Sequence, residues 1–299
     1  MTKTALGWVG TGVMGAAMVR RLLVADYDVA VTSRTRARAQ PLVDAGARWS
    51  DDAQTLAREC SIVITMVGFP SEVEDVYLGP RGLLATTDAA SRALRIAVDM
   101  TTSEPALAIR IAERARALGV ATLDAPVSGG DVGAREGTLS IMVGGDATAL
   151  SELEPIFAAL GKRIVLQGGP GAGQHTKMVN QILIATNMIG VCEGMLYAER
   201  AGLDPLRVID SVGSGAAGSW SVNNLAPRML RGDFKPGFYV EHFIKDLGIA
   251  LREAERLRLA LPGLALARQL YEAVRAQGHG RCGTQALWLA LRHLNGLAG

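Results

Sequence analysis

Aromatic residues are scarce in this chain, and its charges are nearly balanced. Aromatic side chains make up 5% of the 299 residues, and 31 basic residues stand against 29 acidic ones. A surface that binds nucleic acid carries clustered Lys and Arg, and single-strand binders add aromatic side chains on which bases stack. The sequence has neither a basic stripe nor aromatic interleaving, so we expect no nucleic-acid partner.

Cysteine is rarer still. The three cysteines, Cys60, Cys192 and Cys282, are widely spaced and odd in number. No CxxC pair and no Cys/His cluster accompanies them, which is unlike a disulfide framework or a zinc site. The sequence therefore predicts no metal, and thiols that stay reduced inside the cell.

Long hydrophobic runs are also missing. The most apolar later stretch, Ile182–Cys192, is short and contains Asn187. A membrane-spanning helix needs about 18 or more uninterrupted apolar residues. The first residues, Met1-Thr2-Lys3-Thr4, lead directly into a strand pattern without a cleavable signal. We expect a cytoplasmic protein with no membrane partner.

What the chain does have is a large apolar share, 49%, and enough length for two domains. In the first half, strand-like runs alternate with helical patterns. The runs are Ala5–Val9, Asp28–Thr32, Ser61–Val67, Arg95–Met100, Ala121–Val127, Thr138–Val143 and Arg163–Gln167, and the helical patterns include Gly15–Ala25, Pro105–Leu118 and Ala147–Leu160. This alternation predicts a mostly parallel sheet with helices on both faces.

The pattern changes after the turn-rich segment Gly168–Gly173, and no convincing strand follows. His175–Ala201 is predicted to form one long helix that is apolar all round, as buried helices are. Further helices are predicted at Pro205–Val212, Val222–Leu230, Phe243–Leu259, Leu264–Ala276 and Thr284–Leu294. We therefore predict an α/β domain over residues 1–168 and an all-α domain over residues 169–299. Because the long helix buries more surface than one small domain covers, we also expect a homodimer or homotetramer.

A glycine-rich loop follows the first strand and opens a helix within a βαβ unit. It reads Gly10-Thr11-Gly12-Val13-Met14-Gly15. In a dinucleotide-binding loop, the first glycine permits a tight turn, the second lets the backbone approach the pyrophosphate, and the third allows close helix–strand packing. The N-terminus of the helix then faces the phosphates. An ordinary glycine turn lacks this context, so the loop predicts a Rossmann-type domain that binds a nicotinamide dinucleotide.

The end of the second strand decides which dinucleotide is preferred. An acid at this place accepts the ribose hydroxyls of NAD and repels a 2′-phosphate. The chain has Ser33, Arg34 and Thr35 here, and no acid before Asp44. Arg34 can pair with a phosphate, with Thr35 as a further donor, although a solvated basic helix start is an alternative. We predict a preference for NADP(H), with NAD(H) as an alternative cofactor.

Two further segments follow strands of the predicted sheet. After the fourth strand, the hydroxyls of Thr101–Ser103 are placed where open α/β sheets bind ligands, although a helix cap is an equally natural reading. After the fifth strand, Ser128 offers a hydroxyl, and Gly129 and Gly130 expose backbone N–H groups that could hold a carboxylate. A simple glycine turn is the alternative for this second segment.

The long predicted helix begins with a polar face. Lys177 and Asn180 are three residues apart, and Gln181 is four from the lysine, so all three share one side of the helix. Polar groups in an otherwise apolar helix are costly unless they point into a polar site. A lysine there can take or give a proton, whereas a lysine that extends to the surface is the alternative.

In these motifs the chain resembles the β-hydroxyacid dehydrogenase family, which includes 3-hydroxyisobutyrate dehydrogenase, tartronate semialdehyde reductase and the glyoxylate and succinic semialdehyde reductases. Four segments carry the resemblance in order along the whole chain: Gly10–Gly15, Asp124–Gly130, Gly171–Asn180, and Phe234–Phe238 with Lys245-Asp246-Leu247. The resemblance implies a Rossmann-type N-terminal domain and an all-α C-terminal domain, as in 6-phosphogluconate dehydrogenase.

The resemblance also implies roles for individual residues. Lys177 corresponds to the catalytic lysine and Asn180 to the substrate-side amide. Ser128, Gly129 and Gly130 correspond to the carboxylate anchor, Thr102 and Lys245 to cofactor contacts near the nicotinamide, Asp246 to a supporting residue and Phe238 to a residue that closes the pocket. Some members have a second asparagine where this chain has Gln181, which leaves the role of that amide open.

The implied reaction is reversible hydride transfer between a nicotinamide dinucleotide and a small hydroxy acid or its semialdehyde. In reduction, Lys177 would donate a proton to the forming alkoxide, and in oxidation it would accept one. Two alternatives remain. An imine reductase shares the architecture but usually has another residue in place of the lysine, and a non-catalytic dinucleotide-binding scaffold would be expected to lose the lysine or the anchor.

Overall fold

The computed structural model describes residues 5–85 and 91–297 of the chain. By packing, the chain divides into two units, Met1–Lys177 and Met178–Gly299. The division lies inside a single long helix, α8 (Ala172–Arg200). The boundary near residue 168 was predicted from the change of pattern along the sequence, not from packing, and it stays a prediction.

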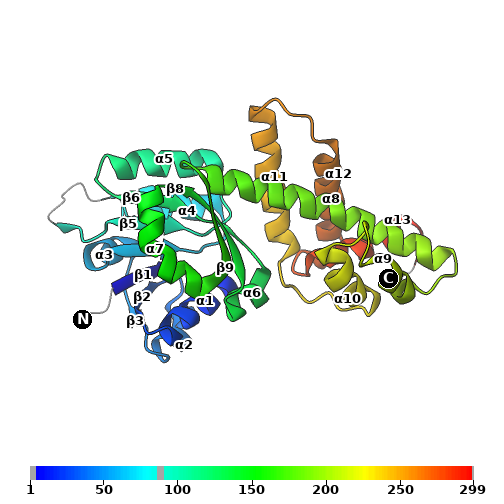
Figure 1. Ribbon diagram of the computed structural model, residues 1–299, viewed down its shortest axis with the longest axis horizontal. Helices are drawn as coiled ribbons and strands as arrows, with labels where there is room; N and C mark the ends of the chain where they lie inside the picture. Colours follow the sequence, from blue (N-terminus) through cyan, green and yellow to red (C-terminus); the bar gives the residue numbers. More distant parts are fainter. Residues whose placement is uncertain (1–4, 86–90, 298–299) are drawn as a thin grey trace. The chain divides into compact units, whose positions relative to one another are not determined.

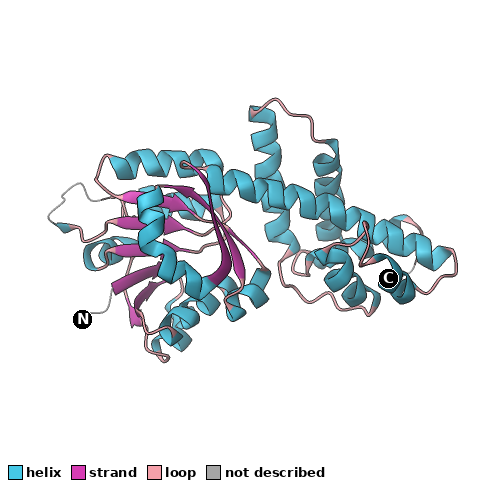
Figure 2. Cartoon of the chain, in the orientation of Figure 1, coloured by secondary structure: helices cyan, strands magenta, loops and turns pink. Residues whose placement is uncertain are grey.

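The first unit alternates strands and helices through most of its length (Figures 1 and 2). Its strands are β1 (Ala5–Val9), β2 (Asp28–Thr32), β3 (Arg48–Trp49), β4 (Ile62–Thr65), β5 (Ile96–Asp99), β6 (Ala121–Asp124), β7 (Val127–Ser128), β8 (Leu139–Gly145) and β9 (Gly161–Gly168). Its helices before α8 are α1 (Val13–Val24), α2 (Arg36–Val43), α3 (Ala53–Glu59), α4 (Pro70–Leu78), α5 (Pro105–Arg116), α6 (Gly130–Glu136) and α7 (Ala147–Leu160).

The strands form one sheet in the order β3-β2-β1-β4-β5-β6-β8-β7, with β9 on β8. The first six in this order run parallel, whereas β8 pairs antiparallel with both β6 and β7. Strands β1, β2, β4 and β5 are almost fully buried because helices cover both faces of the sheet, as parallel sheets require. Side chains of α1, α2 and α7 pack on one face, and those of α3, α4 and α5 on the other. The predicted mostly parallel sheet is confirmed.

The second unit is helical. Beyond α8 it contains α9 (Pro205–Val212), a π-helical segment (Ser221–Leu225), α10 (Ala226–Leu230), α11 (Val240–Arg256), α12 (Pro262–Val274), a second π-helical segment (Arg275–His279), a 3-10 turn (Thr284–Ala286) and α13 (Leu287–Leu294). Its core is built around Phe243 and Tyr271, which meet edge to face with ring centroids 4.9 Å apart. The prediction of an all-α second half is confirmed.

The long helix α8 differs from its prediction. It is 29 residues long and, within residues 5–85 and 91–297, the one helix long and apolar enough to cross a membrane by length and composition. Only 44% of its most apolar stretch is buried. Val179, Leu183 and Tyr197 are more than half exposed, because the core of the second unit covers one side of the helix and leaves this side open. In a single chain the helix is therefore not buried all round, and the expected oligomer that would cover this side stays a prediction.

Candidate active site

The glycine loop after β1 has the geometry that a dinucleotide needs. Gly10 has a φ of 99°, and a Cβ there would lie 2.2 Å from the carbonyl oxygen of Met66. A Cβ on Gly15 would lie 2.1 Å from the carbonyl oxygen of Gly10, so neither position admits a side chain. At Gly12, by contrast, a Cβ would meet no protein atom within 4 Å. Gly10 and Gly15 are thus required by the fold, whereas the space beside Gly12 is open to a ligand.

The start of α1 also fits an anionic ligand. The N-cap is Gly12, which brings no side-chain hydrogen bond, and the first turn holds no acidic residue. The N–H groups of the first turn therefore keep capacity for phosphate oxygens. The hydroxyl of Thr11 is buried and has no hydrogen-bond partner among the described residues, while Val13 is 61% exposed and Met14 packs against the core. These features match a pyrophosphate site.

At the end of β2, Arg34 lies on the surface with 83% of its side chain exposed. Its Nη1 is 2.5 Å from Oε1 of Glu72, a residue of α4 that the sequence analysis did not single out. Thr35 is the N-cap of α2 but makes no side-chain cap bond, so its hydroxyl is not used by the helix. Arg34 and Thr35 are both exposed at the place where a 2′-phosphate would be recognised.

The segment after β5 is held by its neighbours. The hydroxyl of Thr101 accepts a hydrogen bond from the N–H of Val67 at 3.0 Å, and the N–H of Ser103 donates to Oε1 of Gln174 at 2.9 Å. Thr102, between them, is half-buried. The helix α5 begins after Glu104, with Pro105 in its first turn. The cap therefore does not depend on Thr102, whose predicted cofactor contact stays a prediction.

The candidate anchor and the candidate base lie next to each other in the first unit. Lys177 is buried, and its Nζ donates to the carbonyl oxygen of Val127 at 2.9 Å. Val127 directly precedes Ser128, which is half-buried, and Gly129 and Gly130 follow with φ values of 134° and 62°. Only glycine adopts these two conformations readily. The structure therefore rules out the surface lysine and brings the amine to the strand that carries the Ser-Gly-Gly segment.

A buried network, which the sequence analysis did not predict, fixes the start of α8. Asp124, at the end of β6, accepts hydrogen bonds from the N–H groups of Gly171 and Gln174, each at 2.8 Å. The side chain of Gln174 also donates to the carbonyl oxygen of Thr101 at 2.7 Å. Asp124 thus caps the helix that carries Lys177 one turn later, and Gln174 ties it to the segment after β5. Burial raises the pKa of Asp124 to about 6, against the opposing effect of these N–H donors.

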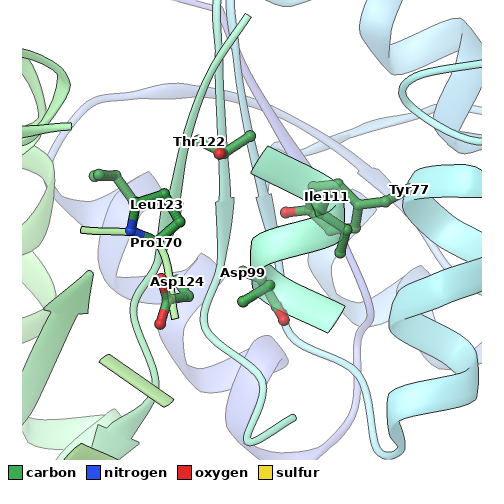
Figure 3. Close-up of a pocket in the computed structure, with 8 residues that line it drawn as sticks. Tyr77, Asp99, Ile111, Thr122, Leu123, Asp124 and Pro170 are labelled. Carbon is green, nitrogen blue, oxygen red and sulfur yellow. The ribbon is translucent and has the colours of Figure 1, made fainter. Parts of the chain in front are cut away.

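Figure 3 shows Asp124 beside Asp99, its partner in register on β5, next to a small pocket. Other residues that line this pocket are Tyr77, Ala108, Ile111, Thr122, Leu123 and Pro170. The space holds no more than about one water molecule. The pocket is therefore too small for a hydroxy acid and belongs to the packing behind the start of α8.

In the second unit, a chain of polar contacts joins three of the predicted residues. The side-chain amide of Asn180 donates to Gln181 at 2.7 Å, and Gln181 donates to Oδ2 of Asp246 at 2.5 Å. Oδ1 of the buried Asp246 is 3.0 Å from Nζ of Lys245. Gln181, whose role the sequence left open, thus orients Asn180 and partners Asp246. Phe238 packs edge to face on Phe243 within the same unit.

Comparisons with known proteins agree with this geometry. A sequence family described as the NAD binding domain of 6-phosphogluconate dehydrogenase matches residues 5–169, and one described as NAD-binding of NADP-dependent 3-hydroxyisobutyrate dehydrogenase matches residues 171–291. The chain belongs to the β-hydroxyacid dehydrogenase family. Its first unit contains an NAD(P)-binding domain, which confirms the family and the fold that the motifs implied.

Relatives of known sequence cover nearly the whole chain. An uncharacterized oxidoreductase of Bacillus subtilis, YkwC, is 50% identical over 96% of this chain and 98% of its own length. The probable 3-hydroxyisobutyrate dehydrogenase-like 1 of Arabidopsis thaliana is 48% identical over 99% of this chain and 88% of its own. The 2-hydroxy-3-oxopropionate reductase of Escherichia coli is 39% identical over 96% of each chain.

Solved structures share the fold over nearly the whole chain. The 3-hydroxyisobutyrate dehydrogenase of Mycobacterium tuberculosis with L-serine has a TM-score of 0.86 at 29% identity, covering 97% of this chain and 100% of that one. Psf3, in complex with NADP+ and 2-OPP, has a TM-score of 0.85 at 28% identity, covering 96% and 99%. An imine reductase from Pseudomonas sp. reaches 0.64 at 20% identity, covering 97% and 100%. That last likeness is one of fold alone and does not favour the imine reductase alternative.

Proposed function

We propose that the chain is an NADP(H)-preferring oxidoreductase that interconverts a small hydroxy acid and its semialdehyde, with Lys177 as the proton donor and acceptor. The observation that carries this proposal is the buried amine of Lys177. It lies 2.9 Å from the carbonyl oxygen of Val127, the residue that directly precedes Ser128. A buried lysine amine beside the Ser-Gly-Gly segment is placed to exchange a proton with a substrate oxygen held there.

The residues of the first unit support a division of labour. Gly10–Gly15 would hold the pyrophosphate, and the bound dinucleotide would exchange hydride with the substrate carbon. Ser128 with Gly129 and Gly130 would bind the substrate carboxylate, which sets the distance between its reacting carbon and Lys177. Fixing the substrate in this way supplies much of the rate enhancement, because the reacting groups no longer lose freedom in the transition state. Lys177 would donate a proton to the substrate oxygen in reduction and accept one in oxidation.

The residues of the second unit are proposed to contact the substrate and cofactor. Asn180 lies one turn after Lys177 on the same helix, and its amide is oriented by Gln181. We assign Asn180 to the substrate oxygen, Asp246 to the support of that amide, Lys245 to the cofactor and Phe238 to the closing of the pocket. Lys245 and Asp246 neutralise each other, which a buried pair of charges requires.

For the substrate, the names of two relatives suggest candidates. The Arabidopsis relative is named for 3-hydroxyisobutyrate and the Escherichia coli relative for 2-hydroxy-3-oxopropionate. Both compounds are short hydroxy acids, or their oxidised forms, with one carboxylate, which fits the Ser128–Gly130 anchor. We therefore propose a substrate of this size and charge, and a cytoplasmic enzyme.

The test is a steady-state assay of NADPH oxidation with methylmalonate, tartronate and succinic semialdehydes, glyoxylate and a cyclic imine. Lys177→Met should lower kcat with the preferred aldehyde by at least about a hundredfold, as loss of a general acid–base does, while NADPH binding stays unchanged. Lys162→Met, on the exposed strand β9, is the matched control and should keep full activity.

Three outcomes of this assay would contradict the proposal. Near-normal turnover by the Lys177 variant would remove the lysine from catalysis. Turnover of the imine alone would favour an imine reductase. NADPH binding without turnover of any compound would favour a non-catalytic scaffold.

We also propose a homodimer or homotetramer through the exposed side of α8. Val179 and Leu183, one turn apart, are 56% and 64% exposed on a helix that is otherwise apolar. Leu183→Glu should shift the protein towards the monomer in sedimentation experiments. An unchanged oligomer, or a wild-type protein that is monomeric, would contradict this assignment.

A further inference from the structure

The contact between Arg34 and Glu72 joins segments that follow two different strands of the sheet. Arg34 follows β2 and Glu72 lies in the first turn of α4, after β4. In the sheet, β1 lies between β2 and β4. An ion pair of 2.5 Å therefore joins the two segments that flank β1 and its glycine loop. It sits where the adenosine half of a dinucleotide is selected.

The carboxylate is the fixed member of this pair. Oε2 of Glu72 accepts hydrogen bonds from the N–H groups of Gly68, at 2.7 Å, and Phe69, at 3.1 Å. The side chain of Glu72 is 19% exposed, whereas that of Arg34 is 83% exposed. The loop after β4 thus holds the acid in place, and the long arginine side chain reaches across to it.

We infer that Glu72 selects the cofactor by competing with the 2′-phosphate of NADP(H) for Arg34. The inference rests on the proposed cofactor site and concerns a residue outside the usual position for such an acid. The end of β2 has no carboxylate, since Ser33, Arg34 and Thr35 stand there. Glu72 supplies a carboxylate from the segment after β4 instead. This carboxylate pairs with the guanidinium of Arg34, which the phosphate would also bind.

Charge decides the direction of the effect. A phosphate that binds Arg34 either displaces Glu72 or lies within a few ångströms of its carboxylate, and like charges at that separation repel. The opposing effect, in which Glu72 orients Arg34 for the phosphate, is small because exposed ion pairs contribute little. Glu72 therefore weakens NADP(H) binding and lets the enzyme accept NAD(H) as well.

The experiment compares direct binding of NADPH and NADH to full-length wild type, Glu72→Gln and Glu74→Gln by titration calorimetry, without substrate. The amide of the Glu72→Gln variant keeps an oxygen for the N–H groups of the loop but carries no charge. We expect the NADPH-to-NADH preference of Glu72→Gln to rise about tenfold. Glu74 lies two residues further on α4 and pairs with Arg110, away from Arg34, so its variant should stay within about twofold of wild type.

A second pair of variants guards against an indirect effect on the loop. If Glu72 acts on Arg34, the gain from Glu72→Gln should fall below about threefold when Arg34 is also replaced by Ala. The same gain without Arg34, an unchanged or lower preference in Glu72→Gln, or an equal rise in Glu74→Gln would each overturn the inference. Wild type that binds neither dinucleotide would overturn the proposed function too, whereas wild-type binding with an unaffected Glu72 variant overturns the inference alone.

Discussion

The two sides of the candidate site in the first unit are built in opposite ways. Around Lys177, the polar groups are buried and hydrogen-bonded to backbone, as with Asp124 and Gln174. At the end of β2, the proposed selecting group is Arg34, which is exposed and whose ion pair among the described residues is with Glu72. Buried hydrogen bonds restrict a side chain to one position, whereas an exposed ion pair lets the side chain adopt many.

Because of this difference, substitutions on the two sides should alter different properties of the protein. A buried polar group that loses its partner costs the full penalty of desolvation, whereas an exposed ion pair contributes between about 0 and 1 kcal/mol. Substitutions near Lys177 should therefore alter stability and rate together. Substitutions near Arg34 should alter the choice of cofactor and leave stability as it was.

The largest effect is expected from Asp124→Ala. This change leaves the buried N–H groups of Gly171 and Gln174 without an acceptor and removes the cap of α8. The free energy of unfolding should fall by about 3 kcal/mol, as expected when bonds to a buried charged group are lost. Urea denaturation measures it. Glu152→Ala, which breaks an exposed pair with Arg95, is the control and should change stability by less than about 1 kcal/mol. An equal loss of unfolding free energy in both variants would contradict the predicted difference between the buried network and the exposed ion pairs.

Gln174→Ala should have the next largest effect. Its side chain makes two buried hydrogen bonds, to the N–H of Ser103 and the carbonyl oxygen of Thr101. Losing them should lower stability by about 2 kcal/mol and kcat by about tenfold, because Lys177 lies one turn further along the helix. A positioning role predicts a fall in kcat with KM for NADPH unchanged in steady-state assays. A loss of stability with normal kcat would make Gln174 purely structural.

The pH dependence of the rate tests the same network without a substitution. Burial raises the pKa of Asp124 to about 6, and the ionised carboxylate is the form that accepts both N–H groups. In the reduction direction, kcat should therefore fall as the pH drops below 6 and Asp124 becomes protonated. The free energy of unfolding changes in the opposite direction. Because the pKa of Asp124 is higher in the folded protein than in the unfolded chain, protonation of Asp124 stabilises the fold. This contribution is fully present below the unfolded pKa of about 4 and is lost as the pH rises through 6. A flat kcat profile down to pH 5, measured beside thermal unfolding, would remove Asp124 from the reaction.

The sequence alone was sufficient to predict the elements whose patterns are local. The glycine loop, the alternating strands and the helices Ala147–Leu160 and Pro205–Val212 are found at or near their predicted bounds. The predicted strand Ala121–Val127 is broken at Ala125–Pro126, since proline has no N–H to donate to the sheet. The short strand β3 (Arg48–Trp49) was missed because two residues carry no periodicity.

The contacts that join distant segments could not be predicted in the same way. Glu72 lies on a helix whose sequence shows no link to Arg34, and only the sheet order brings their strands to either side of β1. Asp124 and Gln174 were both visible in motifs, but their bond depends on where α8 starts relative to β6. A signal was available at Gln174, a polar residue in the first turn of an apolar helix.

The smallest effect on stability is expected from Arg34→Ala. Its side chain is 83% exposed and its one described ion pair is with Glu72, so the free energy of unfolding should change by less than about 0.5 kcal/mol. NADPH binding should nevertheless weaken about tenfold, since the 2′-phosphate loses a charged donor, while NADH binding stays within about twofold. Paired calorimetric titrations and urea denaturation measure both quantities. If the variant loses stability as Asp124→Ala does, or weakens NADH and NADPH binding alike, then the two sides of the site are not independent. Arg34 would then support the fold of the loop rather than choose the cofactor.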